Sequence, residues 1–572
     1  MFIVEAGFTA ILLTLALAAP HFAPLRLRRV RQLFTRLARR RWLAVLSVTA
    51  SALLLRLVLL PVFPVPQPFV HDEFSYLLAG ETFASGRLTN PTHPLWMHFE
   101  SFHISHWPSY MSMYFPGQGV MLAAGKLLFG HPWFGVWLTT GLMCGAICWM
   151  LQAWLPPVWA LGGGMIAVMR LGIFSYWMNS YWGGSLAALG GALVLGALPR
   201  LMRRPRAASA LVLGCGFAIL AVTRPYEGLW LSLPVIFVLG QAAWEAAAGR
   251  GPAPQMKLAF LGQVAAPLAA VLLAMGYYNW RVFGSPWTLP YQINRNTYAQ
   301  AQVFLWQKPH PEPPYRHKEF RDFYVSMELA EFQETRTVRG YLNGIAKKFG
   351  IMAFFFFGIV LIIPLAMLPW ALADRRIRFL VLCGAVFLFG LCLNAWFFPH
   401  YAAPATAIVY AVLIQCMRHL RAWRPAMANM IPALCILLVV IRLLAGPLNL
   451  TISRWPSMWY GTEGLGLPRW RIASELHARP GRHLAIVRYA PAHNPVDDWV
   501  YNEPDIDASR IAWAREMSPE ENAKLMAYFG DRAVWLVEPD AMPPRISRQS
   551  APYGRGSVTV SEPRPQEAVA LR

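Results

Sequence analysis

Long runs of apolar residues alternate with short polar loops along most of the chain. Many of these runs approach the about 20 residues that a transmembrane helix needs. The run at 117–129 is too short to cross comfortably, so we expect it to dip into the membrane without crossing. The pattern predicts an all-α polytopic membrane protein with about 12–13 transmembrane or membrane-dipping helices. Its expected spans include 3–20, 42–63, 133–153, 158–174, 183–198, 207–223, 228–245, 258–280 and 428–445.

The pattern changes after the last span. HLAIVRY at 483–489 and RAVWLVEP at 532–539 have the character of β-strands. Residues 518–530 have the character of a helix, and Ser518 and Glu521 suit a capping box at its start. The sequence therefore predicts a small C-terminal soluble α/β domain.

The first run raises the question of a cleaved signal peptide. Such a peptide begins with positive charge, whereas here the early charge is Glu5 and the Arg residues follow the run. We expect an uncleaved span with its N-terminus outside. The expected parts are 1–41, an extra N-terminal span and basic cytoplasmic segment; 42–445, the transmembrane domain; and 446–572, the α/β domain.

Charge fixes the expected topology. The chain is 56% hydrophobic and 14% charged, with a net charge of +22. Nucleic-acid binding can explain a basic chain, but the Arg clusters here lie in short loops between apolar runs, as the positive-inside rule requires. No nucleic-acid partner is expected. The segments expected in the cytoplasm are 26–41, 199–206, 374–378 and 418–424, and those expected in the periplasm are 64–115, 281–345 and 450–572.

Metal-binding and redox patterns are weak. The seven Cys residues lie in or at the edge of apolar runs, which predicts neither a disulfide framework nor a CxxC metal site. His98, Glu100 and His103 do not have the spacing of a known ligand motif, and interfacial His residues explain them better. Asp505 and Asp507 form a DxD that matches nucleotide-sugar enzymes only superficially. We expect no metal ligands; a divalent metal cofactor stays open.

Two adjacent carboxylates stand out. VHDEFSY, residues 70–76, follows the apolar run 42–63 and places Asp72 and Glu73 at the membrane–water boundary. A carboxylate there loses hydration, so its position needs a reason. One reason is a helix N-terminus, since both residues suit the first turn of a surface helix at 72–86. The other is catalysis by a carboxylate base beside a lipid-embedded substrate.

The order of short motifs on the outer face resembles the GT-C superfamily of membrane glycosyltransferases. The branch it resembles holds bacterial lipid A aminoarabinose transferases and protein O-mannosyltransferases. Members carry an Asp-Glu-type motif early in the first outer loop, here Asp72-Glu73, and a short helix that ends in Leu-Phe-Gly, here 128–130. A late outer loop often carries Arg-Tyr-x-x-Pro, here the segment 400–404, HYAAP. The resemblance covers about residues 42–445.

Three positions depart from the family pattern. His400 replaces the Arg of the late motif. Residues 114–118, YFPGQ, replace the Lys-Pro-Pro often found before the short helix, and residues 179–184, NSYWGG, lack the Asp of the second outer loop. These departures put the donor phosphate clamp and the sugar pocket of the family in doubt here.

The resemblance implies a glycosyltransferase in the bacterial inner (plasma) membrane, with its active site facing the periplasm. The donor would be a polyprenyl-phosphate-linked sugar, hexosyl or pentosyl, and the acceptor an envelope lipid, glycan or protein. Asp72 would act as general base with inversion of the anomeric centre, and Glu73 would position the acceptor or the base. The other expected residues are Arg224, Arg281, His400 and Tyr401 at the donor phosphate, and His71, Tyr181, Trp182, Glu227, Trp287 and Tyr291 at the sugar or acceptor.

Other interpretations remain open at this stage. Arg224 also suits an ion pair with Glu227, three residues on, and Tyr401 suits an interfacial anchor. A transporter or flippase would show charged residues at a midplane cavity and repeated halves, and no internal repeat is found. A non-catalytic subunit of an envelope glycan assembly complex is the third interpretation, with the α/β domain as its docking module.

Overall fold

The computed structural model describes residues 2–18, 28–248, 258–445 and 467–549. Within these ranges, seven helices are long and apolar enough to cross a membrane. They are α3 (Arg41–Val58), α6 (Trp133–Trp154), α8 (Ser185–Arg203), α10 (Pro225–Ala247), α11 (Leu258–Phe283), α18 (Thr406–Trp423) and α19 (Pro425–Leu443). Further helices of the bundle are α1 (Phe2–Ala18), α2 (Arg28–Arg39), α7 (Pro157–Ala167), α9 (Ala207–Thr223), α15 (Val338–Phe356), α16 (Leu368–Ala373) and α17 (Arg378–Cys392).

The outer loops carry short helices. The first holds α4 (His71–Ala84), the 3-10 helix η1 (Trp96–Phe99) and a two-stranded antiparallel pair of β1 (Ile104–Ser105) and β2 (Met111–Ser112). The long loop after α11 holds α12 (Pro290–Tyr298), α13 (Lys318–Arg321), the π-helix η3 (Asp322–Leu329) and α14 (Ala330–Thr335). Residues Pro399–Tyr401 form the short 3-10 helix η5 just before α18.

The C-terminal domain is built on one sheet. Its strands are β3 (His483–Val487), β4 (Ile511–Arg515), β5 (Ala533–Glu538) and β6 (Arg545–Arg548), in the order β4-β3-β5-β6. β3 pairs in parallel with β4 and β5, and β6 is antiparallel to β5. The helices are α20 (Leu467–Ala478) and α21 (Pro519–Tyr528), and the Ser518 hydroxyl accepts from the Glu521 amide at the start of α21, as expected.

This confirms the predicted fold class, a polytopic helical protein with a small α/β region at its end. The domain division stays a prediction, since the boundary at 446 lies outside the described residues.

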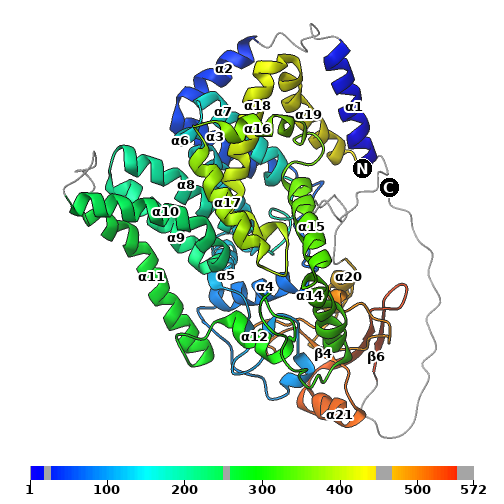
Figure 1. Cartoon of the computed structure of the whole chain (residues 1–572). Coiled ribbons are helices and arrows are strands. Elements are labelled where there is room, and N and C mark those ends of the chain that lie inside the picture. The colour runs from blue at the N-terminus through cyan, green and yellow to red at the C-terminus, as the bar shows by residue number, and fades with distance from the viewer. Residues whose placement is uncertain (1, 19–27, 249–257, 446–466, 550–572) are drawn as a thin grey trace.

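The basic segments gather at one end of the bundle. The amide of Gln152 donates to the carbonyl of Arg41, the guanidinium of Arg203 donates to the carbonyl of Ala153, and Arg421 lies 5.8 Å from the ring centre of Trp159. The C-terminal domain lies at the opposite end, beside α4, α12 and α14 (Figure 1). The two faces expected from charge are therefore separated in space.

The short apolar helix α5 (Pro116–Phe129) holds α4 against the bundle. Its 14 residues span about 21 Å, less than the about 30 Å hydrocarbon core. Glycines bring the backbones close: a Cβ on Gly80 of α4 would lie 2.7 Å from that of Leu122, and one on Gly125 would lie 2.2 Å from the amide of Gly135. α5 thereby holds α4 in position, together with the segment that leads into α5 at Pro116.

The C-terminal sheet shares a hydrophobic core with the first outer loop. Phe74 and Leu78 of α4 pack in one buried cluster with Leu484 and Ile486 of β3. The Phe74 ring stacks on Tyr501 with centroids 4.0 Å apart. The domain therefore supports the outer-loop helix that carries the two carboxylates.

Candidate functional site

Asp72 lies in the first turn of α4, with its side chain directed away from the helix backbone. The Tyr114 hydroxyl donates to Oδ1, and Nδ1 of His103 lies 3.7 Å from Oδ2. Burial raises the pKa of Asp72, but the charge and hydrogen bond of His103, together with the Tyr114 hydrogen bond, lower it to well below its usual value. Its side chain is 17% exposed. Asp72 is thus an ionised carboxylate whose side chain is partly exposed.

Glu73 caps the start of α4, a role for which the sequence made both Asp72 and Glu73 candidates. Its Oε2 accepts from the amides of Phe69 and Val70 at 2.8 and 3.1 Å, and its Oε1 accepts from the amide of Tyr181 at 3.0 Å. Burial raises the pKa of Glu73 to about 7, although these three hydrogen bonds oppose the rise. The Glu73 carboxyl group therefore joins the start of α4 to the second outer loop. The Asp72 carboxylate takes no part in these three hydrogen bonds.

His103 reaches Asp72 through an unusual backbone conformation. Its φ is +59°, in the left-handed region that few residues other than glycine adopt. Its carbonyl accepts from the Ser75 hydroxyl at 2.6 Å and from the Met113 amide at 3.1 Å, which holds the turn in place. The ring Nδ1 then lies 3.2 Å from the Tyr114 oxygen. Strained backbone of this kind collects at functional sites.

Arg224 supplies the positive charge on the other side of the site. It stands between α9 and α10, and Nη1 lies 3.7 Å from Oε1 of Glu227, the ion pair that the sequence allowed. Its guanidinium also lies 4.4 Å from the ring centre of Tyr401. Burial lowers the pKa of Arg224, but the charge of Glu227 and the nearby Tyr residues raise it above its usual value. The guanidinium is a permanent cation.

His400 is a buried neutral ring. The Tyr176 hydroxyl accepts from the His400 amide at 3.0 Å and forms a second hydrogen bond of 2.9 Å with Nδ1 of the ring. Burial and the charge of Arg224 lower its pKa well below the usual value. His400 lies beside Trp182 as a neutral polar ring. Its expected place at the donor phosphate stays a prediction.

A cluster of tyrosines lies within the fields of both Asp72 and Arg224. Burial raises the pKa of Tyr76, Tyr291 and Tyr401; the charge of Asp72 adds to this rise and that of Arg224 opposes it. Coulomb interactions in a protein weaken with distance and are screened by salt. The Asp72 carboxylate, which accepts from Tyr114, and the Arg224 guanidinium, which lies over Tyr401, therefore act on the same tyrosines.

Other expected residues line the surroundings of this cluster. Tyr181 is buried, and its hydroxyl donates to the carbonyl of Pro66 at 3.0 Å. Trp182 packs against Phe398 and His400. His71 points to the C-terminal domain: its Nε2 lies 2.9 Å from the carbonyl of Pro495 and its ring stacks on Phe102.

Two expected residues do not join the site by any contact. Trp287 is 87% exposed. Arg281 is exposed on α11, where its guanidinium donates to the Tyr277 hydroxyl at 3.2 Å. Their assignments stay predictions.

Sequence reasoning missed Tyr114, Tyr76 and Tyr176, and weighed His103 only as an interfacial residue or a metal ligand. Tyr114 stacks on Tyr76 with centroids 4.4 Å apart, so the two rings form one wall beside Asp72. Tyr114 lies in the segment 114–118, which departs from the Lys-Pro-Pro of the family that the sequence resembles. This departure was the feature of the sequence that could have pointed to Tyr114. Tyr176 and His103 come near the site only through tertiary packing.

The described residues hold no group of three or more His, Cys, Asp or Glu side chains that could bind a metal ion. His98 bonds the carbonyl of Arg515, Glu100 bonds Tyr298, and His103 turns to Asp72. The three residues of the weak ligand pattern thus point to different partners.

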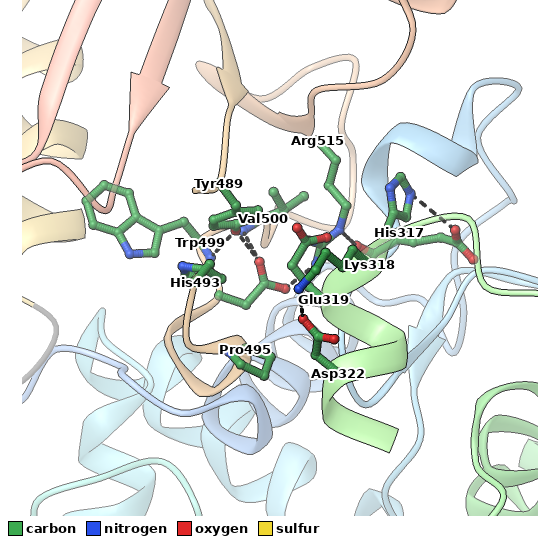
Figure 2. Close-up of polar contacts among 12 residues, drawn as sticks. His317, Lys318, Glu319, Asp322, Tyr489, His493, Pro495, Trp499, Val500 and Arg515 are labelled. Atoms are coloured by element: carbon green, nitrogen blue, oxygen red, sulfur yellow. Dashed lines mark hydrogen bonds and ion pairs between the residues drawn. The ribbon is translucent and has the colours of Figure 1, made fainter. Parts of the chain in front are cut away.

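The C-terminal domain holds the first outer loop through a buried charge network. Arg515 of β4 pairs with Asp498, donates to the carbonyl of Glu100 at 2.8 Å, and lies 3.7 Å from Glu319 of α13. Figure 2 shows Arg515 and Glu319 facing each other across the interface, with Tyr489 beside them. One side chain therefore ties β4 to both outer loops that flank the site.

Comparison with known proteins gives a likeness of fold. No family model matches the sequence, and no curated protein matches it. ArnT from Cupriavidus metallidurans, solved bound to undecaprenyl phosphate, has a TM-score of 0.46 and 13% identity over 86% of this chain and 92% of its own. The oligosaccharyltransferase of Archaeoglobus fulgidus has a TM-score of 0.45 and 12% identity over 86% of this chain and 67% of its own.

Both solved proteins are GT-C enzymes, the superfamily that the motifs of this sequence resemble. By its own helices, the chain is a multi-pass α-helical membrane protein. Because both TM-scores lie below 0.5, the functional assignment below rests on the residues of this chain.

Proposed function

We propose that this protein is a membrane glycosyltransferase that moves a sugar from a polyprenyl-phosphate donor to an envelope acceptor on the periplasmic face. One observation carries the proposal: the ionised, partly exposed carboxylate of Asp72 and the permanent cation of Arg224 act on the same group of tyrosines, with Tyr114 against Asp72 and Tyr401 against Arg224. A base and a phosphate clamp on opposite sides of a sugar are what an inverting transfer needs. The motif order of the sequence supports the same assignment.

In the proposed reaction, Asp72 accepts the proton of an acceptor hydroxyl as that oxygen attacks the anomeric carbon. The bond from this carbon to the phosphate oxygen breaks, and polyprenyl phosphate leaves with the electron pair. Arg224 stabilises the negative charge that develops on the leaving phosphate. Tyr401, held under Arg224, orients the guanidinium.

His103 and Tyr114 keep Asp72 ionised before the acceptor binds. A donor phosphate nearby would raise the pKa of Asp72 through like charge, which moves the carboxylate toward the basicity that proton abstraction needs. Glu73 takes the positioning role expected from the sequence, because its three backbone hydrogen bonds fix the turn that carries Asp72.

The direct test is transfer by the purified full-length protein. Polyprenyl-phosphate sugars extracted from the native membrane and labelled in the sugar serve as donors, with envelope lipid, glycan and protein fractions as acceptors. We expect label in one acceptor fraction, and mass spectrometry should show that the same modification is lost when the gene is deleted. Unchanged envelope glycans and no transfer to any fraction would refute the proposal and favour a transporter or an assembly subunit.

A further inference from the structure

A cavity of about 330 Å³ lies between the loop that holds η1 and β1 and the long loop after α11. Residues of η1, β1, α12 and α13 line it. Pockets of about 300–1,000 Å³ hold small ligands. The proposed reaction gives this cavity no role.

Two buried polar groups of the lining have no partner. Ser105 and His106 are each 3% exposed, and neither Oγ of Ser105 nor Nε2 of His106 makes a hydrogen bond. Buried polar atoms are almost always hydrogen-bonded to protein, water or a ligand, so these two atoms are open to a ligand that offers donors or acceptors of its own.

Aromatic rings form the apolar part of the lining. Trp96, Tyr298, Tyr315 and Phe320 border the cavity, and Trp107, 69% exposed, stands there as well. Such rings bind the flat C–H face of a pyranose, whose rim of hydroxyls needs polar partners at the edge. An alkyl chain would leave the polar groups of the cavity unpaired.

The charges of the cavity argue against an anionic ligand. Arg316 stacks on Trp96 at 4.7 Å, and its Nη1 lies 3.5 Å from Oε1 of Glu100, so this cation is already paired. Burial lowers the pKa of His106 to about 4, which leaves its ring neutral. Burial raises the pKa of Glu100, but His317 lowers it below its usual value, so the carboxylate is an ionised acceptor for hydroxyl groups.

We propose that this cavity is a saccharide-binding site that holds a sugar unit of the acceptor. The proposal rests on the glycosyltransferase function and makes that acceptor a glycan or a glycan-bearing molecule. The link to the site is short: His103 contacts Asp72, and Ser105 and His106 follow it two and three residues later. The Cα atoms of residues 103 and 106 are at most roughly 10 Å apart, about the reach of a short oligosaccharide.

The cavity also connects to the site through stacked rings. Phe320 lines the cavity and stacks on Phe102 at 4.3 Å, and Phe102 stacks on His71, the residue before Asp72. A sugar in the cavity would therefore press on the segment that positions the base. The saccharide site and the base lie on two sides of one loop.

Binding of methyl glycosides to the purified full-length protein tests the proposal. Methyl glycosides of the common hexoses and N-acetylhexosamines serve as probes, followed by saturation-transfer NMR and Trp fluorescence. We expect at least one to bind, with affinity reduced at least tenfold by Trp96→Ala and by Ser105→Ala. Ser105→Ala removes a hydroxyl that has no partner, so its thermal unfolding should match that of the wild type. Trp470→Ala, an exposed Trp on α20, is the control and should bind like the wild type.

The saccharide site would be overturned if no methyl glycoside bound. It would also be overturned if Trp96→Ala and Ser105→Ala bound the glycosides with the same affinity as the wild type. The outcome is separable from that of the proposed function, because Asp72→Asn should still bind the glycosides. Binding of methyl glycosides without any sugar transfer would contradict the glycosyltransferase proposal and indicate a saccharide-binding protein. Transfer with no effect of Trp96→Ala on the acceptor KM would sink the cavity proposal alone.

Discussion

At the scale of residues, the site depends on the two groups that hold Asp72 ionised. Tyr114→Phe removes a hydrogen bond to the carboxylate, and His103→Gln removes the largest influence that lowers its pKa. Each change should raise the pKa of Asp72, the His103 change by more. A hydrogen bond to a charged group contributes about 1.5–3 kcal/mol, or about one to two pH units.

The pH profile of transfer measures this effect. A base works only when deprotonated, so raising its pKa moves the acid limb of kcat/KM to higher pH. In the double variant burial, which raises the pKa of Asp72, is opposed only by the charge of His71, so the acid limb should move further toward about pH 4 than in either single variant. Profiles identical to the wild type in all three variants would remove His103 and Tyr114 from the account.

Glu73 should behave as a positioning residue. In Glu73→Gln an NH₂ group replaces one oxygen and meets an amide donor, so a buried donor is left unpaired. We expect a loss of about 1–3 kcal/mol in the free energy of unfolding, with a smaller loss of turnover than Asp72→Asn causes. Glu81→Gln, on the same helix and in a partly exposed pair with Lys126, should cost less than about 1 kcal/mol. Equal thermal unfolding of Glu73→Gln and wild type would contradict this role.

Sequence reasoning found the carboxylate pair because it follows a span in a short polar segment, and the helix begins there at His71. It could not divide the work within the pair. That division depends on which carboxylate meets the amides of residues 69, 70 and 181, and on Tyr114 lying against Asp72. Contacts between distant segments leave no periodicity in the sequence.

At the scale of elements, the C-terminal domain stabilises the outer loops through Arg515. Arg515→Met leaves Asp498 buried without its main cation, and breaking a buried pair in this way costs about 3–5 kcal/mol. We expect easier proteolysis between the domain and the bundle, a lower melting temperature and reduced transfer. Asp498→Asn added to Arg515→Met should recover part of the loss, because the unpaired charge is gone.

Lys524→Ala is the control for this element. It breaks an exposed pair with Glu521 on α21 and should cost about 0–1 kcal/mol. If Arg515→Met melted and transferred like Lys524→Ala, the domain would be a separate module, and its contact with the outer loops would have no part in the activity.

Helix positions were the most predictable part of the elements. The expected spans 133–153 and 207–223 correspond to α6 (Trp133–Trp154) and α9 (Ala207–Thr223), because apolar runs with polar ends define them. The shared core of α4 and β3 was not predictable, since neither segment shows in its own sequence which distant segment it packs against.

At the scale of the whole molecule, the separation of the basic loops from the aromatic and polar loops predicts the membrane orientation. Single Cys residues at exposed positions Arg204 and Glu312, in a background without the seven native Cys, test it. With the outer membrane permeabilised, an impermeant maleimide should label Cys at 312 and leave Cys at 204 unlabelled until the inner membrane is opened. Labelling of 204 but not 312 in intact inner membranes would reverse the topology and place the site in the cytoplasm.

The proposed orientation places the base, the cation and the saccharide cavity on one side of the membrane, where an envelope acceptor is found. The helix α1 belongs to the same assembly, because Glu5 forms a buried ion pair with Arg442 of α19. The retention of this span stays a prediction, supported by that pair.

The most direct test of the central claim is single-turnover transfer by Asp72→Asn protein beside its wild type. Asn keeps the size of Asp and can accept the Tyr114 hydrogen bond, but it cannot take a proton at neutral pH. We expect unchanged melting and unchanged donor binding, with the rate of the chemical step lowered on the order of 10²–10⁴-fold. If Asp72→Asn protein transferred sugar at the wild-type rate, Asp72 would only start a helix, and the proposed glycosyltransferase would have no base.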